Sequence, residues 1–191
     1  AMDECKMLAE YLNAPVVNSY LHNDSFPANH PLWCGPLGYH GSKAAMKILQ
    51  RADVVIALGT RLGPFGTLPQ YGMDYWPTNA QIVQIDADHK MLGLVKNISV
   101  GICGDTKSSS IALLDYLRSR ELKCKRNSDD RMRTLTSEKE AWENELTNWI
   151  HEEDDWSLSV IQKAREGELH PRQVLRELEN ALPEDAMVST D

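Results

Sequence analysis

The sequence predicts an α/β protein with a Rossmann-like parallel β-sheet, and three segments support this fold class. The run Asp53–Leu58 is rich in β-branched residues and lacks polar alternation, which is typical of a strand covered on both faces. A helical pattern over Ser42–Arg51 precedes it and a second strand, Gln81–Asp86, follows it, as in βα units. We therefore expect a parallel sheet within residues 14–122 in which Asp53–Leu58 is central and flanked by helices, with ligands at the carboxyl edge.

Before the central strand, the pattern predicts a helix over residues 3–12, ended by Pro15, and a short strand over Pro15–Asn18. This is an αβ unit that lacks its first strand. Residues 19–41 are predicted to be a long, ordered, irregular connection rich in proline, glycine and aromatic residues. A Walker loop is excluded there because the order is Gly-Ser-Lys, so Ser42 is expected to be a plain helix N-cap.

After the central strand, four further elements are predicted in order. They are a loop over Arg61–Asn79, a helical turn over Lys90–Val95, a strand over Ser99–Ile102 and a helix over Thr106–Leu122 with Thr106 as its cap.

The C-terminal part of the chain differs in composition and predicts a mostly helical extension. Charged residues dominate from Lys123 to about Arg133, which indicates a domain boundary. A helix over Glu138–His151 places Trp142 and Trp149 on one stripe, where we expect both to be buried. A helix that opens at Pro171 and a strand over Met187–Thr190 follow.

These patterns divide the chain into three parts and suggest a fragment of a longer polypeptide. The parts are a central α/β domain over 1–122, a charged linker and helix over 123–168, and the start of a further domain over 169–191.

Composition excludes several classes of partner. The 191 residues have a net charge of −8, which argues against nucleic acid and anionic membranes. No apolar run is long enough to span a bilayer, so a soluble protein is predicted. The four cysteines show no zinc or dense disulfide spacing, which favours reduced structural thiols in the cytoplasm.

Four short motifs, in a fixed order, resemble the thiamine-diphosphate-dependent enzymes that include acetohydroxyacid synthase. They are a strand ending in Gly59-Thr60-Arg61, a strand ending in Ile85-Asp86, a strand ending in Gly104-Asp105, and the terminal His170-Pro171 helix with its Thr190-Asp191 end. The resemblance implies the middle domain of such an enzyme and the entry to its third, diphosphate-binding domain.

Within that superfamily, three loops resemble the sulfoacetaldehyde acetyltransferase family: Asn18–Pro27, Pro31–Gly41 and Gly59–Pro69. The resemblance implies conversion of sulfoacetaldehyde and phosphate to acetyl phosphate and sulfite, a reaction of taurine metabolism, with thiamine diphosphate and Mg²⁺ in a cytoplasmic homodimer or homotetramer. In the family, the carboxylate that activates the cofactor and the metal motif lie in the first and third domains. The fragment alone is therefore expected to be inactive, with no catalytic residue, metal site or bound cofactor.

The resemblance also implies a nucleotide-shaped groove, which holds a flavin in the synthase and an adenine nucleotide in oxalyl-CoA decarboxylase. The residues that match its lining are Gly38, Tyr39, His40, Gly41, Gly59, Thr60, Arg61, Ile85, Asp86, Gly104 and Asp105. Tyr39 and His40 are also possible contacts of the substrate or cofactor, with a hydrogen-bonded loop histidine as the alternative. Arg61 is expected to pair with Asp86 or Asp88, and phosphate or sulfonate binding is its alternative role.

Three other functions stay open at this point. The parent could be an acetolactate synthase-like enzyme, the chain could be a nucleotide- or FAD-binding α/β module related to sirtuins or electron-transfer flavoproteins, or the domain could only join and space two catalytic domains.

Overall fold

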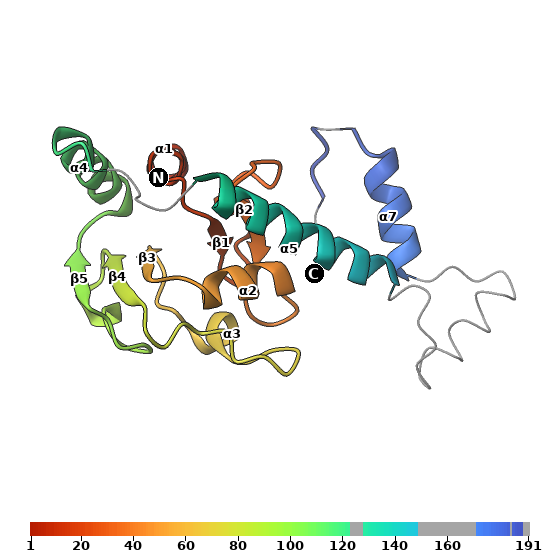
Figure 1. Cartoon of the computed structure of the whole chain (residues 1–191), viewed down its shortest axis with the longest axis horizontal. Coiled ribbons are helices and arrows are strands. Elements are labelled where there is room, and N and C mark those ends of the chain that lie inside the picture. The colour runs from red at the N-terminus through yellow and green to blue at the C-terminus, as the bar shows by residue number, and fades with distance from the viewer. Residues whose placement is uncertain (123–127, 149–170, 184, 189–191) are drawn as a thin grey trace, which may run out of the picture. The chain divides into compact units, whose positions relative to one another are not determined.

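The structure is a computed structural model that describes residues 1–122, 128–148, 171–183 and 185–188 (Figure 1). Residues 1–142 form one compact unit and residues 143–191 a second one, and each is described here by itself. The helix α5, Ser128–Asn148, crosses the division between the two units.

The main sheet consists of three parallel strands: β3 (Val54–Leu58), β4 (Gln81–Asp86) and β5 (Val100–Cys103). Their order is β3-β4-β5, so β4 is central, and the prediction that Asp53–Leu58 is the central strand is wrong. An apolar run indicates that both faces of a strand are covered by other parts of the protein. The position of the strand in the sheet depends instead on the hydrogen bonds along its two edges. The parallel α/β fold class itself is confirmed.

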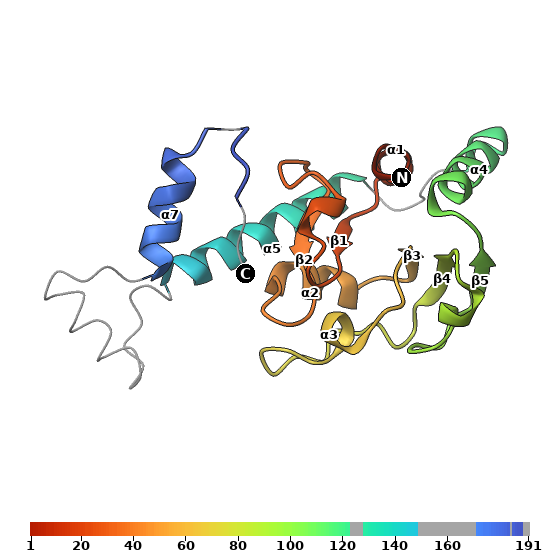
Figure 2. The same cartoon turned by 180° about the vertical axis from the view of Figure 1, so that it is seen from behind.

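A separate sheet pairs β1 (Val16–Asn18) with β2 (Trp33–Pro36), again in parallel. β2 lies inside the segment 19–41 that was predicted to be irregular, so that prediction missed a strand. Gly35 and Pro36 explain the error, because glycine and proline are depleted in strands. In Figures 1 and 2, β1 and β2 lie to one side of β3, and β4 and β5 to the other.

Two helices, α1 (Met2–Leu12) and α4 (Thr106–Ser119), pack against each other. The Tyr11 hydroxyl donates to the Leu117 carbonyl at 3.3 Å, and Lys107 lies 3.3 Å from Glu4. Both views show the two helices near each other at the same side of the strands (Figures 1 and 2). Asn13 closes α1 in the left-handed conformation that such helix ends often adopt.

On the β1–β2 side, α2 (Lys43–Gln50) and the first part of α5 enclose the largest core cluster. Its buried members are Cys34, Leu37, Ala45, Met46, Leu49, Tyr75 and Leu135. Ser42 caps α2 as predicted, because its hydroxyl accepts from the Ala45 N–H at 3.2 Å.

The helix α5 begins at Ser128, earlier than the predicted start at Glu138, and its first turns belong to the core. Leu135 is only 1 % exposed. The Glu138 carboxylate forms ion pairs with Lys47 of α2 at 3.0 Å and with Arg51, the C-cap of α2, at 2.6 Å. The charged composition of this stretch therefore reflects the outer face of a helix that packs by its inner face.

The tail predictions have mixed outcomes. The helix is confirmed up to Asn148, and Trp142 is half-buried, with its ring 5.8 Å from that of Tyr71. Trp149 lies outside the described residues. The helix α7, Pro171–Ala181, is confirmed, whereas Met187 and Val188 form no strand and the remainder of that predicted strand lies outside the described residues.

Shorter elements complete the described chain. They are the 3₁₀ turns η1 (Asn23–Ser25) and η2 (His89–Met91) and the single-turn helix α3 (Pro64–Thr67). None of the described helices has the length and apolar character that a bilayer crossing requires.

The described cysteines differ sharply in environment, which gives a testable prediction. Cys34 is 3 % exposed, and burial raises the pKa of its thiol to about 12, whereas Cys103 is exposed. Because the thiolate is the reactive form, iodoacetamide should alkylate Cys103 in the folded protein and Cys34 only after unfolding. Peptide mass spectrometry over time measures both rates. Equal rates at Cys34 and Cys103 under native conditions would contradict the buried position of Cys34.

Candidate functional site

Three strand ends are aligned at the carboxyl edge of the main sheet. The Gly59 N–H donates to the Ile85 carbonyl at 2.9 Å, and the Gly104 N–H donates to the Asp86 carbonyl at 2.9 Å. The residues after β3, β4 and β5 that were predicted to share one edge are thus brought together by backbone hydrogen bonds.

Two glycines let α4 approach this edge closely. Gly59 has a φ of +61°, and a Cβ there would lie 3.0 Å from the Thr106 hydroxyl. A Cβ at Gly104 would lie 3.0 Å from the Ser109 hydroxyl. A larger residue at either position would require the hydroxyl of Thr106 or Ser109 to move by a few tenths of an ångström, and at Gly59 it would also have to adopt a positive φ.

Asp105, and not Thr106 as predicted, caps α4. Its carboxylate accepts from the Ser108 backbone N–H at 2.9 Å and from the Ser108 hydroxyl at 3.0 Å. The hydrogen bond from the Ser108 backbone, followed by that from its hydroxyl, lowers the pKa of Asp105. The N-terminus of α4 is therefore already occupied by an anionic group of the chain itself.

This cap predicts a pH dependence of stability. Because the pKa of Asp105 is lowered in the folded state, its stabilising effect is present above the carboxyl's ordinary pKa and is lost as the pH falls through the lowered value. Asp105→Asn should keep the cap but lose this titration, and Asp105→Ala should lose the cap at every pH. Urea unfolding across the acid range measures the effect, and identical pH profiles for wild type and Asp105→Asn would contradict it.

Gln84, in the centre of β4, supports this edge and was missed by the sequence analysis. The side chain is fully buried and donates to the carbonyls of Thr60 at 2.9 Å and Met91 at 3.1 Å. Its own oxygen accepts from the Gly93 N–H at 2.8 Å. A polar residue inside an otherwise apolar strand was the signal that could have revealed it.

The acidic and basic side chains at the edge have separate roles. Asp86 accepts from the Asp88 N–H at 2.9 Å, and Asp88 in turn caps η2 through the Lys90 N–H. The described structure has no ion pair between Arg61 and either of these carboxylates, so the expected pairing is not found. The Arg61 side chain is exposed beside Gly63.

The second group of predicted residues, Gly38 to Gly41, follows β2. Gly38 and Gly41 are buried, while Tyr39 and His40 are exposed. The Tyr39 N–H donates to the Phe65 carbonyl at 2.8 Å. Gly38 has a φ of +83°, and a Cβ there would lie 1.7 Å from the Phe65 carbonyl oxygen, so only glycine fits.

Tyr71 fixes this loop to the segment after β3, and Tyr75 forms a hydrogen bond within that segment. The Tyr71 hydroxyl donates to the Gly41 carbonyl at 3.0 Å, and the buried Tyr75 hydroxyl donates to the Gly66 carbonyl at 3.1 Å. Burial raises the pKa of Tyr75 to about 12, against the opposite effect of a backbone hydrogen bond with Gly38. The predicted loops 19–41 and 61–79 are therefore held together by hydrogen bonds.

An aromatic surface lies over this contact. The Tyr20 ring is stacked 5.8 Å from Phe65 and meets Tyr39 edge-on at 6.0 Å, and Tyr39 meets His40 at 4.0 Å. His40 has a φ of +53°, an uncommon conformation for a residue with a side chain. The pair predicted as possible substrate contacts is thus exposed and held in a defined backbone geometry.

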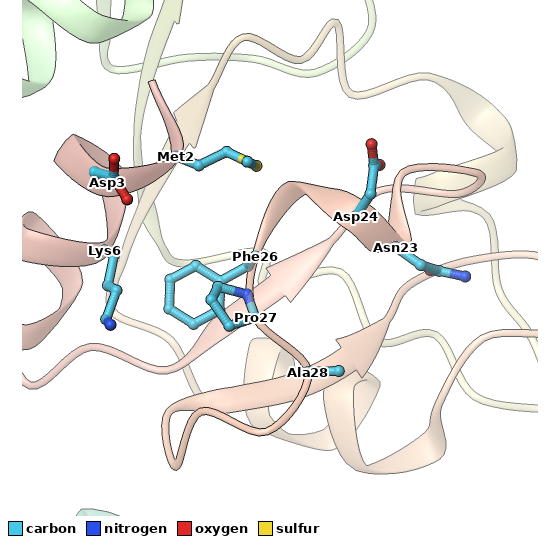
Figure 3. Close-up of a pocket in the computed structure, with 8 residues that line it drawn as sticks. All are labelled: Met2, Asp3, Lys6, Asn23, Asp24, Phe26, Pro27 and Ala28. Carbon is cyan, nitrogen blue, oxygen red and sulfur yellow. The ribbon is translucent and has the colours of Figure 1, made fainter. Parts of the chain in front are cut away.

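A pocket of about 340 Å³ lies elsewhere, between the start of α1 and η1 (Figure 3). Its lining includes Met2, Lys6, Asp24 and Phe26, and none of the predicted site residues contributes to it. Among the described residues, no three His, Cys, Asp or Glu side chains are grouped so that they could hold a metal ion. The carboxylates at the sheet edge, Asp86 and Asp105, each accept a hydrogen bond from a backbone N–H group.

Comparison with known proteins decides the family. Residues 1–114 match the model of the thiamine pyrophosphate enzyme central domain. This chain belongs to the thiamine pyrophosphate enzyme family. The matched residues include the whole three-stranded sheet and the hydrogen bonds Tyr39–Phe65 and Tyr71–Gly41 between the loops after β2 and β3.

Relatives of this central domain include sulfoacetaldehyde acetyltransferases and acetolactate synthases. The sulfoacetaldehyde acetyltransferase of Castellaniella defragrans is 65 % identical over the whole of this chain, which covers 32 % of that protein. The sulfoacetaldehyde acetyltransferase of Alcaligenes xylosoxydans xylosoxydans is 58 % identical over the whole chain, which covers 33 % of that protein. The acetolactate synthase large subunit of Corynebacterium glutamicum is 34 % identical over 60 % of the chain and 18 % of its own length. The chain thus spans about a third of the acetyltransferases it matches.

Proposed function

We propose that this chain is the central part of a sulfoacetaldehyde acetyltransferase, an enzyme that converts sulfoacetaldehyde and phosphate to acetyl phosphate and sulfite. The observation that supports this most strongly is the extent of the similarity. Identity to the acetyltransferases reaches 65 % over the whole chain, whereas identity to the synthase is 34 % and stops after 60 % of the chain.

Thiamine diphosphate, when bound, supplies the carbanion that attacks the aldehyde, and Mg²⁺ holds its diphosphate. In this proposal both bind to parts of the parent other than the described edge, and residues 169–191 open its diphosphate-binding domain. The parent acts as a cytoplasmic homodimer or homotetramer in taurine metabolism.

Activity of the full-length parent tests the proposal. Incubation with sulfoacetaldehyde, phosphate, thiamine diphosphate and Mg²⁺ should release sulfite and form acetyl phosphate, and omission of phosphate should abolish acetyl phosphate formation. Condensation of pyruvate without sulfite release would contradict the proposal and assign the parent to the acetolactate synthases.

Residues 1–191 alone should not bind the cofactor. The described carboxylates lack the grouping that a diphosphate-bound Mg²⁺ needs, with one or two carboxylates in an octahedral oxygen shell. Calorimetric titration with thiamine diphosphate and Mg²⁺ should show no saturable heat, while the parent should bind both. A stoichiometric site with micromolar affinity on the 191-residue chain would contradict the assignment of this fragment to the central part of the enzyme.

The proposed nucleotide groove at the sheet edge is a separate question. The alignment of Gly59, Ile85 and Gly104 supports it, and the occupied N-terminus of α4 disfavours a phosphate there. Thermal unfolding with ADP, NAD or FAD tests the groove, since a ligand of the folded state raises the melting temperature. No shift with any of the three at millimolar concentration would favour a domain that only joins its neighbours.

A further inference from the structure

Tyr71 occupies a turn position that tyrosine seldom takes. In this hairpin the Gln70 N–H donates to the Met73 carbonyl at 3.1 Å, and the Met73 N–H donates to the Gln70 carbonyl at 2.8 Å. The two central residues, Tyr71 and Gly72, have φ values of +51° and +71°. Two successive positive φ values are typical of a type I′ turn, whose first position favours Asn, Asp or Gly. A tyrosine there has a conformational cost, which indicates that its side chain has a role.

The Tyr71 side chain links the loop that carries His40 to the helix α5. Its hydroxyl donates to the carbonyl of Gly41, the residue after His40, at 3.0 Å. Its ring lies 5.8 Å from the ring of Trp142 on α5, at an angle of 53°. One side chain thus contacts two segments that are far apart in the sequence.

Lys43, the first residue of α2, reinforces this link. Its Nζ lies 4.9 Å from the centre of the Tyr71 ring and 5.7 Å from the centre of the Trp142 ring. An ammonium group within about 6 Å of an aromatic face is attracted to it. We call Lys43, Tyr71 and Trp142 the cation–aromatic clamp. Because Lys43 follows Gly41 by two residues, the clamp lies directly beside the loop.

The clamp is anchored through α5. Leu135, Glu138 and Trp142 are spaced by three and four residues, so they share one face of this helix. On that face Leu135 is buried in the core, and Glu138 forms the ion pairs with Lys47 and Arg51. Trp142 therefore extends a face of α5 that is already fixed against α2.

The loop over residues 38–41 needs such support. His40 is exposed, and its φ of +53° is a conformation that persists only where the surroundings impose it. The Gly41 N–H closes the loop by donating to the Gly38 carbonyl at 2.8 Å. The Gly41 carbonyl accepts from the Tyr71 hydroxyl, so the clamp holds the backbone directly after His40.

We propose that the clamp is a positioning device through which α5 fixes the backbone conformation of the loop 38–41, and with it the exposed side chains of Tyr39 and His40. The catalytic part of this inference rests on the proposed function, in which these two residues are candidate substrate contacts. Trp142 is then a positioning residue for the reaction of the parent, because it acts through the other two members of the clamp.

Amide hydrogen exchange in the 191-residue chain tests the clamp without any activity. Tyr71→Phe keeps both rings and removes only the hydroxyl, so it should speed exchange of the Gly41 amide about fivefold. Trp142→Ala should speed it about two- to fivefold, through loss of the cation–aromatic contact. Because the two changes act in series, the double variant should exchange no faster than Tyr71→Phe alone. Trp142→Phe, which keeps an aromatic face for Lys43, should exchange as the wild type does.

Tyr116→Ala is the matched control. Tyr116 is also an exposed ring with a cation beside it, Arg120 at 5.7 Å, but it lies on α4. This variant should leave exchange at Gly41 unchanged, and the amide of Leu114 in α4 reports any general loss of stability. Additive effects of Tyr71→Phe and Trp142→Ala, or no effect of Trp142→Ala, would overturn the proposal.

Kinetics of the parent test the catalytic part. Trp142→Ala should lower kcat/KM for sulfoacetaldehyde about fivefold or more, whereas Trp142→Phe should stay within about twofold of the wild type. Fast exchange at Gly41 together with unchanged kcat/KM in Trp142→Ala would overturn the positioning role. A wild-type parent that releases no sulfite would instead contradict the proposed function, and the exchange experiment would still decide whether the clamp fixes the loop.

Discussion

Replacing Gly38 by alanine is expected to destabilise the 1–142 unit by about 2–5 kcal/mol, combining the cost of a left-handed residue with that of overpacking. The new Cβ would lie 1.7 Å from the Phe65 carbonyl oxygen, which is backbone and cannot rotate away. Relief requires the loop after β2 to separate from the loop after β3, which breaks the hydrogen bond between Tyr39 and Phe65. Urea unfolding followed by circular dichroism measures the loss.

Gly72→Ala is the matched control. Gly72 also has a positive φ, +71°, but nothing lies within 4 Å of its added Cβ. It should therefore show only the backbone cost, about 1–2 kcal/mol. Equal losses for Gly38→Ala and Gly72→Ala would mean that the contact with Phe65 does not hold the two loops together.

Leu135→Ala is expected to cost about 2–5 kcal/mol, because truncation of a buried leucine leaves a cavity in addition to the lost transfer free energy. Leu135 is 1 % exposed and packs in the cluster with Met46 and Tyr75. Leu122→Ala, at a leucine that is 49 % exposed, should change stability by about 0.5 kcal/mol or less. A negligible effect at Leu135 would show that α5 is not part of the 1–142 unit in solution.

Helices and strands were predictable from the sequence where a local residue pattern, such as an apolar stripe with a cap, was enough to indicate the element. The helix α2 combines an apolar stripe with a Ser42 cap, and β4 combines three β-branched apolar residues with an acid at its end, so both were predicted with nearly correct limits. β2 was missed because its four residues contain glycine and proline, and only its pairing with β1 makes it a strand. Pairing is a long-range property that the local sequence does not contain.

The site follows the same division. The shared edge of Gly59, Asp86 and Gly104 was predictable, because the carboxyl ends of parallel strands meet at one side of a sheet. The capping role of Asp105 and the bonds of Gln84 were not, since each depends on one side-chain rotamer. The position of Arg61 at a neighbouring strand end likewise suggested an ion pair with Asp86 or Asp88, which the described structure does not contain.

The edge position of β3 has a consequence for the handling of residues 1–191. Val54–Leu58 carries no charge and no proline, the features that protect natural edge strands from pairing with another chain. At high concentration this edge is therefore a site for association between copies. Val54 is 52 % exposed, so a lysine at this position should raise the soluble yield with little disturbance of the core.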